Sequence, residues 1–148
     1  MKQRITQLGI SLLEVLLSLS IIAIILVMAT RYFFVATNNN KINTAIGQVG
    51  GIVAAAHNWK GIRASFTGIS VQELYNSGQL ENFPGIDNSS TTSISVNDLW
   101  GDPYAITATT GNKVTISITL PTTGNCEALS NAYTGATCSG ATFNYTFS

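Results

Sequence analysis

The fold of this chain is decided by residues 1–30, which read MKQRITQLGISLLEVLLSLSIIAIILVMAT. Two basic residues, Lys2 and Arg4, precede a long apolar run, and the only carboxylate in this stretch is Glu14. As a helix, residues 10–30 would rise roughly 32 Å at about 1.5 Å per residue, which matches a hydrocarbon core about 30 Å thick. The stretch therefore predicts a membrane-spanning helix with one ionisable side chain near its start.

Glu14 needs an explanation, because an ionised group at mid-membrane costs on the order of 3 kcal/mol, and less near the interface. A secretory signal peptide is disfavoured: Gly9 precedes the apolar run, the run is about twice the usual length, and residues 29–31 offer no small-x-small cleavage site. An ordinary single-span anchor explains the apolar run and the flanking positive charge. It leaves Glu14 without a role, so a partner for this carboxylate is expected.

The motif GISLLEV at residues 9–15 resembles the processing site of type IV pilin-like proteins. In that family a short basic leader ends in glycine, and glutamate is the fifth residue of the mature chain. The resemblance implies a leader over residues 1–9, cleavage between Gly9 and Ile10 by a prepilin peptidase, and N-methylation of Ile10. The isoleucine departs from the family pattern, in which phenylalanine or methionine is commoner at this position.

The resemblance also implies that Glu14 acts in filament assembly. Cleavage would create an amine at Ile10, and side chains four residues apart share a helix face. In a filament, the carboxylate would neutralise the amine of a neighbouring subunit and set the register more than add net stability. Ser11, Ser18 and Ser20 are open to two interpretations: close contacts with other helices, or hydrogen bonds to their own backbone.

The residue pattern and the resemblance together predict an α+β pilin fold, in which a long N-terminal helical spine carries a small antiparallel sheet. Residues 10–30 would form the transmembrane and filament-core helix, residues 31–59 its amphipathic continuation, and residues 60–148 the globular head. No proline precedes Pro84, so nothing interrupts the helix. Apolar side chains at spacings of four and three are expected to pack on the head: Ile42, Ile46, Val49, Val53, Ala56 and Trp59.

Local patterns predict the elements of the head. Residues 70–73, SVQE, form a capping-box pattern that begins a short helix ending before Gly78. Residues 104–109 and 114–120 alternate around Gly111-Asn112 and predict a β-hairpin. Three further elements are expected: a short strand within 93–97, a helical turn over 126–131, and a final strand over 141–147.

Cys126 and Cys138 read as one disulfide in an exported head. The resemblance supports this pairing, because pilins typically carry a disulfide that closes a C-terminal loop. Such a bond is worth about 2–3 kcal/mol in the chain-entropy model. Free thiols or a metal pair are the alternatives, although two cysteines and the lone His57 cannot complete a structural zinc site.

The remaining composition points away from several functions. The 148-residue chain has a formal net charge of +0, and beyond Trp59 three basic and six acidic side chains leave the head at about −3. Without a basic run, no dedicated nucleic-acid site is expected. No catalytic motif is present, so neither an enzyme nor a cofactor is expected. His57 reads as a packing or surface residue.

Three acidic residues of the head, Asp87, Asp98 and Asp102, admit two interpretations. They could form a calcium site similar to that of the major pseudopilin, since calcium prefers several hard oxygen ligands. Their spacing matches no compact calcium loop, so surface acids and a turn aspartate are the expectation, with no metal site.

The predicted function is that of a structural subunit of a type IV pilus. Residues 99–104, LWGDPY, resemble the entry to the sheet in type IVb pilins and in the major pseudopilin of type II secretion. The leader is shorter than is usual in the IVb group. The implied partners are identical or related pilin subunits, the peptidase, an inner-membrane assembly platform and an outer-membrane secretin. The precursor would lie in the bacterial inner membrane and the product in an extracellular filament. A type II secretion pseudopilin and a membrane-anchored binding domain are the alternatives.

Overall fold

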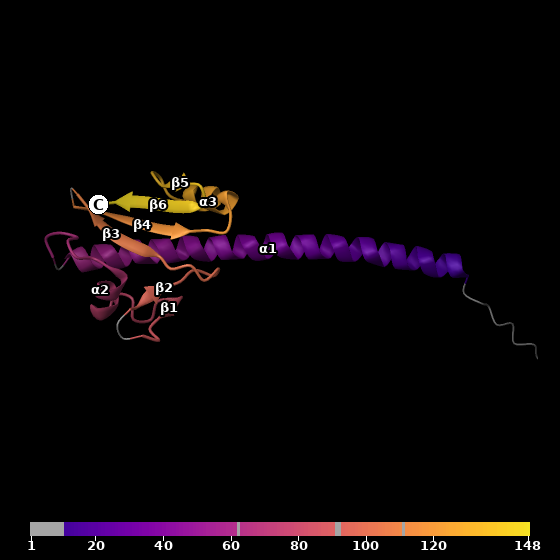
Figure 1. Ribbon diagram of the computed structural model, residues 1–148, viewed down its shortest axis with the longest axis horizontal. Coiled ribbons are helices and arrows are strands. Elements are labelled where there is room, and N and C mark those ends of the chain that lie inside the picture. Colours follow the sequence, from indigo (N-terminus) through magenta and orange to yellow (C-terminus); the bar gives the residue numbers. More distant parts are fainter. Residues whose placement is uncertain (1–10, 62, 91–92, 111) are drawn as a thin grey trace, which may run out of the picture. The chain divides into compact units, whose positions relative to one another are not determined.

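The computed structural model describes residues 11–61, 63–90, 93–110 and 112–148 (Figure 1). A long N-terminal helix is followed by a region of small antiparallel sheets, so the predicted α+β pilin-like layout is confirmed. The elements follow in the order α1 (Leu12–Gly61), α2 (Val71–Asn76), β1 (Ile86–Asp87), β2 (Ser95–Val96), β3 (Ala105–Thr109), β4 (Lys113–Thr119), α3 (Thr123–Ser130), β5 (Thr137–Ser139) and β6 (Thr142–Phe147).

Helix α1 contributes to two compact units, one ending at Asn38 and the other spanning Asn39–Ser148, which we call the head unit. It ends at Gly61, close to the predicted end at residue 59. Within the head unit, two glycines of α1 face other side chains. A Cβ at Gly51 would overlap the Phe83 ring, and one at Gly50 would lie 3.4 Å from the Tyr133 hydroxyl. Glycine weakens a helix intrinsically, and at Gly51 the Phe83 ring that packs against the helix explains its presence, whereas the contact at Gly50 is an ordinary van der Waals distance.

The predicted hairpin is confirmed as β3 and β4, which lie in a four-stranded antiparallel sheet of order β3-β4-β6-β5. Ile106 of β3 is paired with Ile116 of β4, which is paired in turn with Tyr145 of β6. Alternation along β4 buries Val114, Ile116 and Ile118 on one face. The turn residue Asn112 has φ 59°, a left-handed conformation that asparagine adopts more readily than most residues.

The predicted helix caps are also present. Ser70 is the N-cap of α2, and its side chain accepts a hydrogen bond from the Glu73 N–H at 3.2 Å. Gly78, just after the helix, has φ +75°, a conformation that glycine adopts without strain. Helix α3 begins before the predicted turn, because Thr122 caps it by accepting from the Asn125 N–H at 3.2 Å.

Two strands, β1 and β5, were not predicted. β1 pairs with β2 in a separate two-stranded sheet, and β5 pairs with β6 at the edge of the four-stranded sheet. They span two and three residues, too short for an alternating pattern to be recognised.

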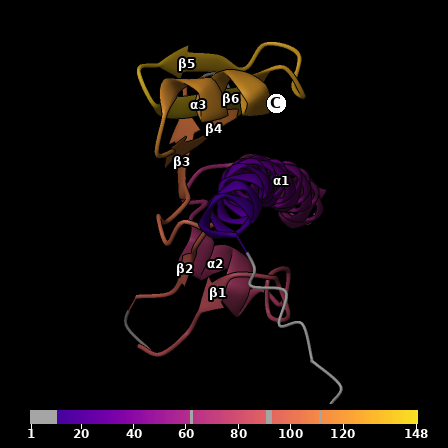
Figure 2. The same cartoon turned by 90° about the vertical axis from the view of Figure 1, so that its right-hand side faces the viewer.

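The core of the head unit surrounds the second half of α1 (Figure 2). The four-stranded sheet and α3 lie on one side of this part of α1, and α2, β1 and β2 lie on the other. Of the predicted apolar stripe, Ile42, Val49, Ala56 and Trp59 are buried, whereas Ile46 and Val53 are partly buried. The stripe is wider than predicted, because α1 also buries Ala45, Gln48, Ile52 and Ala55.

Candidate assembly surface and head contacts

The first half of α1 presents an apolar surface that none of the described residues covers. Every residue from Leu12 to Val35 is exposed. Over this segment the helix rises about 35 Å at about 1.5 Å per residue, and α1 is long and apolar enough to cross a membrane. Apolar surface of this extent marks a site of contact with lipid or protein.

Glu14 is the acidic residue in the first turn of α1. A negative charge is favourable there, because the unpaired N–H groups of a helix start carry partial positive charge. Beyond Glu14, the next charged residue along α1 is Arg31, about 25 Å away at about 1.5 Å per residue. Arg31 is therefore too far away along the helix to be the counter-charge of Glu14. Gly9 and Ile10, the predicted processing residues, lie outside the described residues.

The small polar residues of this segment bond to their own helix. The Ser18 hydroxyl donates to the Val15 carbonyl at 2.9 Å, and Ser20 donates to the carbonyls of Leu16 and Leu17 at 3.0 and 2.8 Å. For Ser18 and Ser20, the structure therefore shows the local hydrogen bonds that were one of the two interpretations. Such bonds satisfy each hydroxyl without a partner helix.

The predicted disulfide is present between Cys126 of α3 and Cys138 of β5. Their Cα atoms lie 6.0 Å apart, and their sequence separation is 12. The Cys126 side chain is fully buried against the core, while Cys138 packs on it from the edge of the sheet. The bond thus fixes the short edge strand and the α3–β5 connection to the core.

A buried hydrogen-bond centre on α1 was not predicted. Gln48, only 3% exposed, donates through Nε2 to the carbonyls of Pro84 and Asn97 at 3.0 and 3.1 Å. Its Oε1 accepts from the Tyr104 hydroxyl at 3.1 Å. Burial, followed by the nearby Asp98 charge, raises the pKa of Tyr104, so its hydroxyl keeps the proton that it donates. One amide therefore joins α1 to the segment around β2 and to the start of β3.

Gly85 completes this centre. Its φ is +86°, and a Cβ there would collide with the Asn97 carbonyl oxygen and lie 2.7 Å from Gln48 Nε2. Sequence offered only a weak signal, since a polar glutamine sat beside Val49 in an otherwise apolar stripe.

We expect Gln48→Leu to lower the free energy of unfolding of the head unit by about 2–4 kcal/mol, because two carbonyls and a hydroxyl lose their buried partner. Thermal unfolding of the full chain in detergent, followed by near-UV circular dichroism, measures the change. Asn43→Leu, at an exposed position of α1, is the matched control and should leave the midpoint nearly unchanged. Equal midpoints for the two variants would show that the Gln48 contacts do not stabilise the head.

The aspartates considered as calcium ligands differ in their exposure and in their hydrogen bonds. Asp98 is 7% exposed, and its Oδ1 accepts from the N–H groups of Trp100 and Asp102 at 2.8 and 2.9 Å, which fixes the turn before β3. Its Oδ2 is buried without a hydrogen-bond partner. Asp87 is exposed, and hydrogen bonds from the side chain and backbone of Ser89 lower its pKa. Nowhere in the described part of the chain do three His, Cys, Asp or Glu side chains gather as metal ligands would.

His57 is exposed and lies against two rings, with centroids 5.4 Å from Phe147 and 6.2 Å from Phe66. These contacts agree with the packing or surface role predicted for it.

The fold and the exposed segment define an α+β protein with a long apolar N-terminal helix and a small head that carries a disulfide. Comparison with protein-family models, curated proteins and solved structures finds no match to this chain.

Proposed function

We propose that this chain is the structural subunit of a type IV pilus filament, assembled through its N-terminal helix. The observation that carries the proposal is the fully exposed apolar segment from Leu12 to Val35, with a single carboxylate, Glu14, in its first turn. The head unit has its own buried core and disulfide. Its fold therefore does not depend on the apolar segment, which is left for contacts with other molecules.

The exposed segment would have two successive environments. In the precursor, lipid of the bacterial inner membrane covers it; in the filament, the helices of neighbouring copies replace the lipid. Helix association in an apolar medium depends on close packing and on pairing of polar groups. Glu14 would supply the polar partner, and the amine created at Ile10 would be its counter-charge. Such a pair is costly to break in an apolar surrounding, so it selects one register.

The partners that follow from this proposal are a prepilin peptidase, an inner-membrane assembly platform, an outer-membrane secretin and other copies of the chain. The mature filament would be extracellular. A membrane-anchored binding domain is the alternative that makes the opposite prediction, because it would use α1 only as a tether and would keep its N-terminus.

We expect the mature chain to begin at Ile10 with a methylated amine. The order of basic residues, Gly9, apolar helix and Glu14 supports this position. Intact-mass measurement of protein purified from the membrane and surface fractions, with N-terminal sequencing by tandem mass spectrometry, identifies the first residue. A chain that begins at Met1, or after residue 29, would contradict processing at Gly9.

A further inference from the structure

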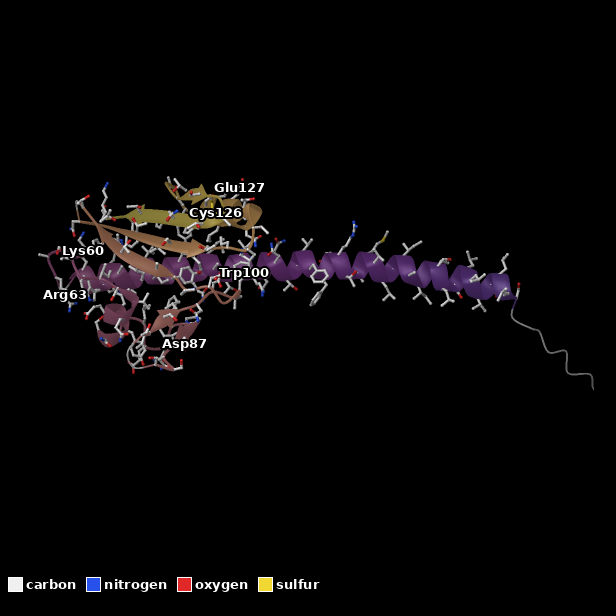
Figure 3. All side chains as sticks on the ribbon, viewed as in Figure 1. Lys60, Arg63, Asp87, Trp100, Cys126 and Glu127 are labelled. Atoms are coloured by element: carbon white, nitrogen blue, oxygen red, sulfur yellow. A yellow bond between two sulfur atoms is a disulfide. The ribbon has the colours of Figure 1, made fainter. Side chains whose placement is uncertain are left out.

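Three cationic side chains lie at one end of the head unit. All three follow the buried stripe of α1 in the sequence. Lys60 lies in the last turn of α1, and Arg63 follows the helix. The Phe66 N–H donates to Asn112 Oδ1 at 2.9 Å, which holds the loop after α1 against the β3–β4 turn. Lys113 is the first residue of β4, directly after that turn. We call Lys60, Arg63 and Lys113 the cationic end; Figure 3 labels the first two.

These charges are positioned but not neutralised. Lys60 Nζ lies 4.6 Å from the centroid of the Phe66 ring, and Arg63 Cζ lies 4.3 Å from that of Trp59. Ring faces attract a cation but leave its charge in place. Within the described residues, no carboxylate forms an ion pair with these three side chains. The cationic end therefore presents a fixed positive charge to an outside partner.

The opposite end of the four-stranded sheet carries exposed carboxylates. β3 and β4 are antiparallel, so Asp102, before β3, and Glu127, in the helix after β4, lie at the same end. Both side chains are exposed, and Figure 3 shows Glu127 and Trp100 well away from Lys60 and Arg63. Lys41 lies at this end too, 5.6 Å from the Trp100 ring centroid. With the buried Asp98, acidic residues outnumber basic ones there, and we call Asp102 and Glu127 the acidic end.

The two ends are too far apart to compensate each other within one copy. β4 runs from Lys113 to Thr119, about 20 Å at about 3.3 Å per residue. The Debye length at physiological ionic strength is about 8 Å. Each end therefore acts on its surroundings separately, with a positive charge at the cationic end and a net negative charge at the acidic end.

We propose that neighbouring copies contact head to head, with the cationic end of one against the acidic end of the next. The proposal rests on the filament function and adds a second contact to that of the α1 helices. A contact between two different patches of the same chain is heterologous, and a heterologous contact that does not close into a ring produces an open helical filament. Two cationic ends placed together would repel, so the charges also select the polarity of the head contact.

Charge reversal tests this contact. Lys60→Glu/Arg63→Glu and Asp102→Lys/Glu127→Lys should each lower the yield of sheared fibre several-fold at matched expression. The quadruple variant, which inverts both patches, should restore most of the yield, and a merely structural role for these residues would not give that rescue. Asp87→Lys is the control, because this exposed acid of β1 belongs to neither end. Its fibre yield should equal that of the wild type.

Lys60 and Arg63 also contact rings, so thermal unfolding of each variant is measured in parallel. If the first double variant fails to fold, Lys113→Glu, Glu127→Lys and their combination repeat the test with side chains that have no ring contact. Wild-type fibre yield in the single-patch variants, or no rescue in the combined variant, overturns the head contact and leaves the filament function standing. Loss of yield from the cationic variants alone, with the acidic variants unaffected, would assign the cationic end to another anionic partner and also overturn it. Absence of fibres from wild-type cells would instead remove the proposed function itself.

Discussion

Replacing Glu14 by Gln is expected to reduce the ratio of sheared fibre to membrane-bound protein by about tenfold or more, while insertion and head folding stay intact. A neutral amide is cheaper in lipid than a charge, so membrane levels should not fall. In the filament, the Ile10 amine would lose its counter-charge in an apolar bundle, and an unpaired buried charge costs about 3–5 kcal/mol. The two fractions are quantified by immunoblotting with an antibody to the head, at matched expression.

Two further variants separate assembly from anchoring. Glu14→Leu makes the segment more apolar, so a simple tether should be retained as well or better, whereas the assembly role predicts a loss as large as that of Glu14→Gln. Ser18→Ala is the control, because the Ser18 hydroxyl bonds only to its own helix among the hydrogen bonds described, and its fibre ratio should match the wild type. Wild-type ratios in both Glu14 variants would rule out the assembly role.

Removing the disulfide is expected to lower the stability of the head unit substantially. Cys126→Ala/Cys138→Ala should lower the free energy of unfolding by about 3 kcal/mol, because the unfolded chain regains the freedom that a closed short loop denies it. For a head of this size, that change lowers the midpoint of thermal unfolding by about 10–20 °C. Differential scanning calorimetry of the oxidised wild type and of the double variant measures the difference.

Because Cys126 is fully buried, its replacement by Ala also removes a packed sulfur atom. Chemical reduction of the wild-type protein breaks the bond without this change and is therefore the control. The reduced wild type should unfold near the temperature of the double variant. A midpoint that is unchanged by reduction would show that the α3–β5 connection is held by packing alone.

The elements of the fold that could be predicted from the sequence are those with a long pattern or with a residue type that has one physical use. The uninterrupted apolar run and the absence of proline before Pro84 predicted α1. Alternation on both sides of Asn112 predicted the hairpin, and Ser70 with Glu73 predicted the start of α2. In each case, neighbouring residues along the chain carry the signal, so no knowledge of tertiary contacts was needed.

The contacts that sequence did not reveal depend on residues far apart in the chain. The hydrogen bonds of Gln48 could not be predicted, because its partners Pro84, Asn97 and Tyr104 come close to it only in the folded head. The same holds for Gly51, because the ring of Phe83, which is distant in sequence, leaves no room for a Cβ at this position. For the candidate assembly surface, sequence identified the apolar segment and Glu14. The partner proposed for them belongs to another molecule, so neither the sequence nor a single chain contains the geometry of that contact.

The proposed function is tested most directly by locating the wild-type chain in its native host. Sheared surface material is imaged by electron microscopy after gold labelling with an antibody to the head. We expect thin filaments labelled along their whole length, composed mainly of chains that begin at Ile10. Finding the chain only in the membrane fraction, with no labelled filament on or off the cell surface, would contradict it.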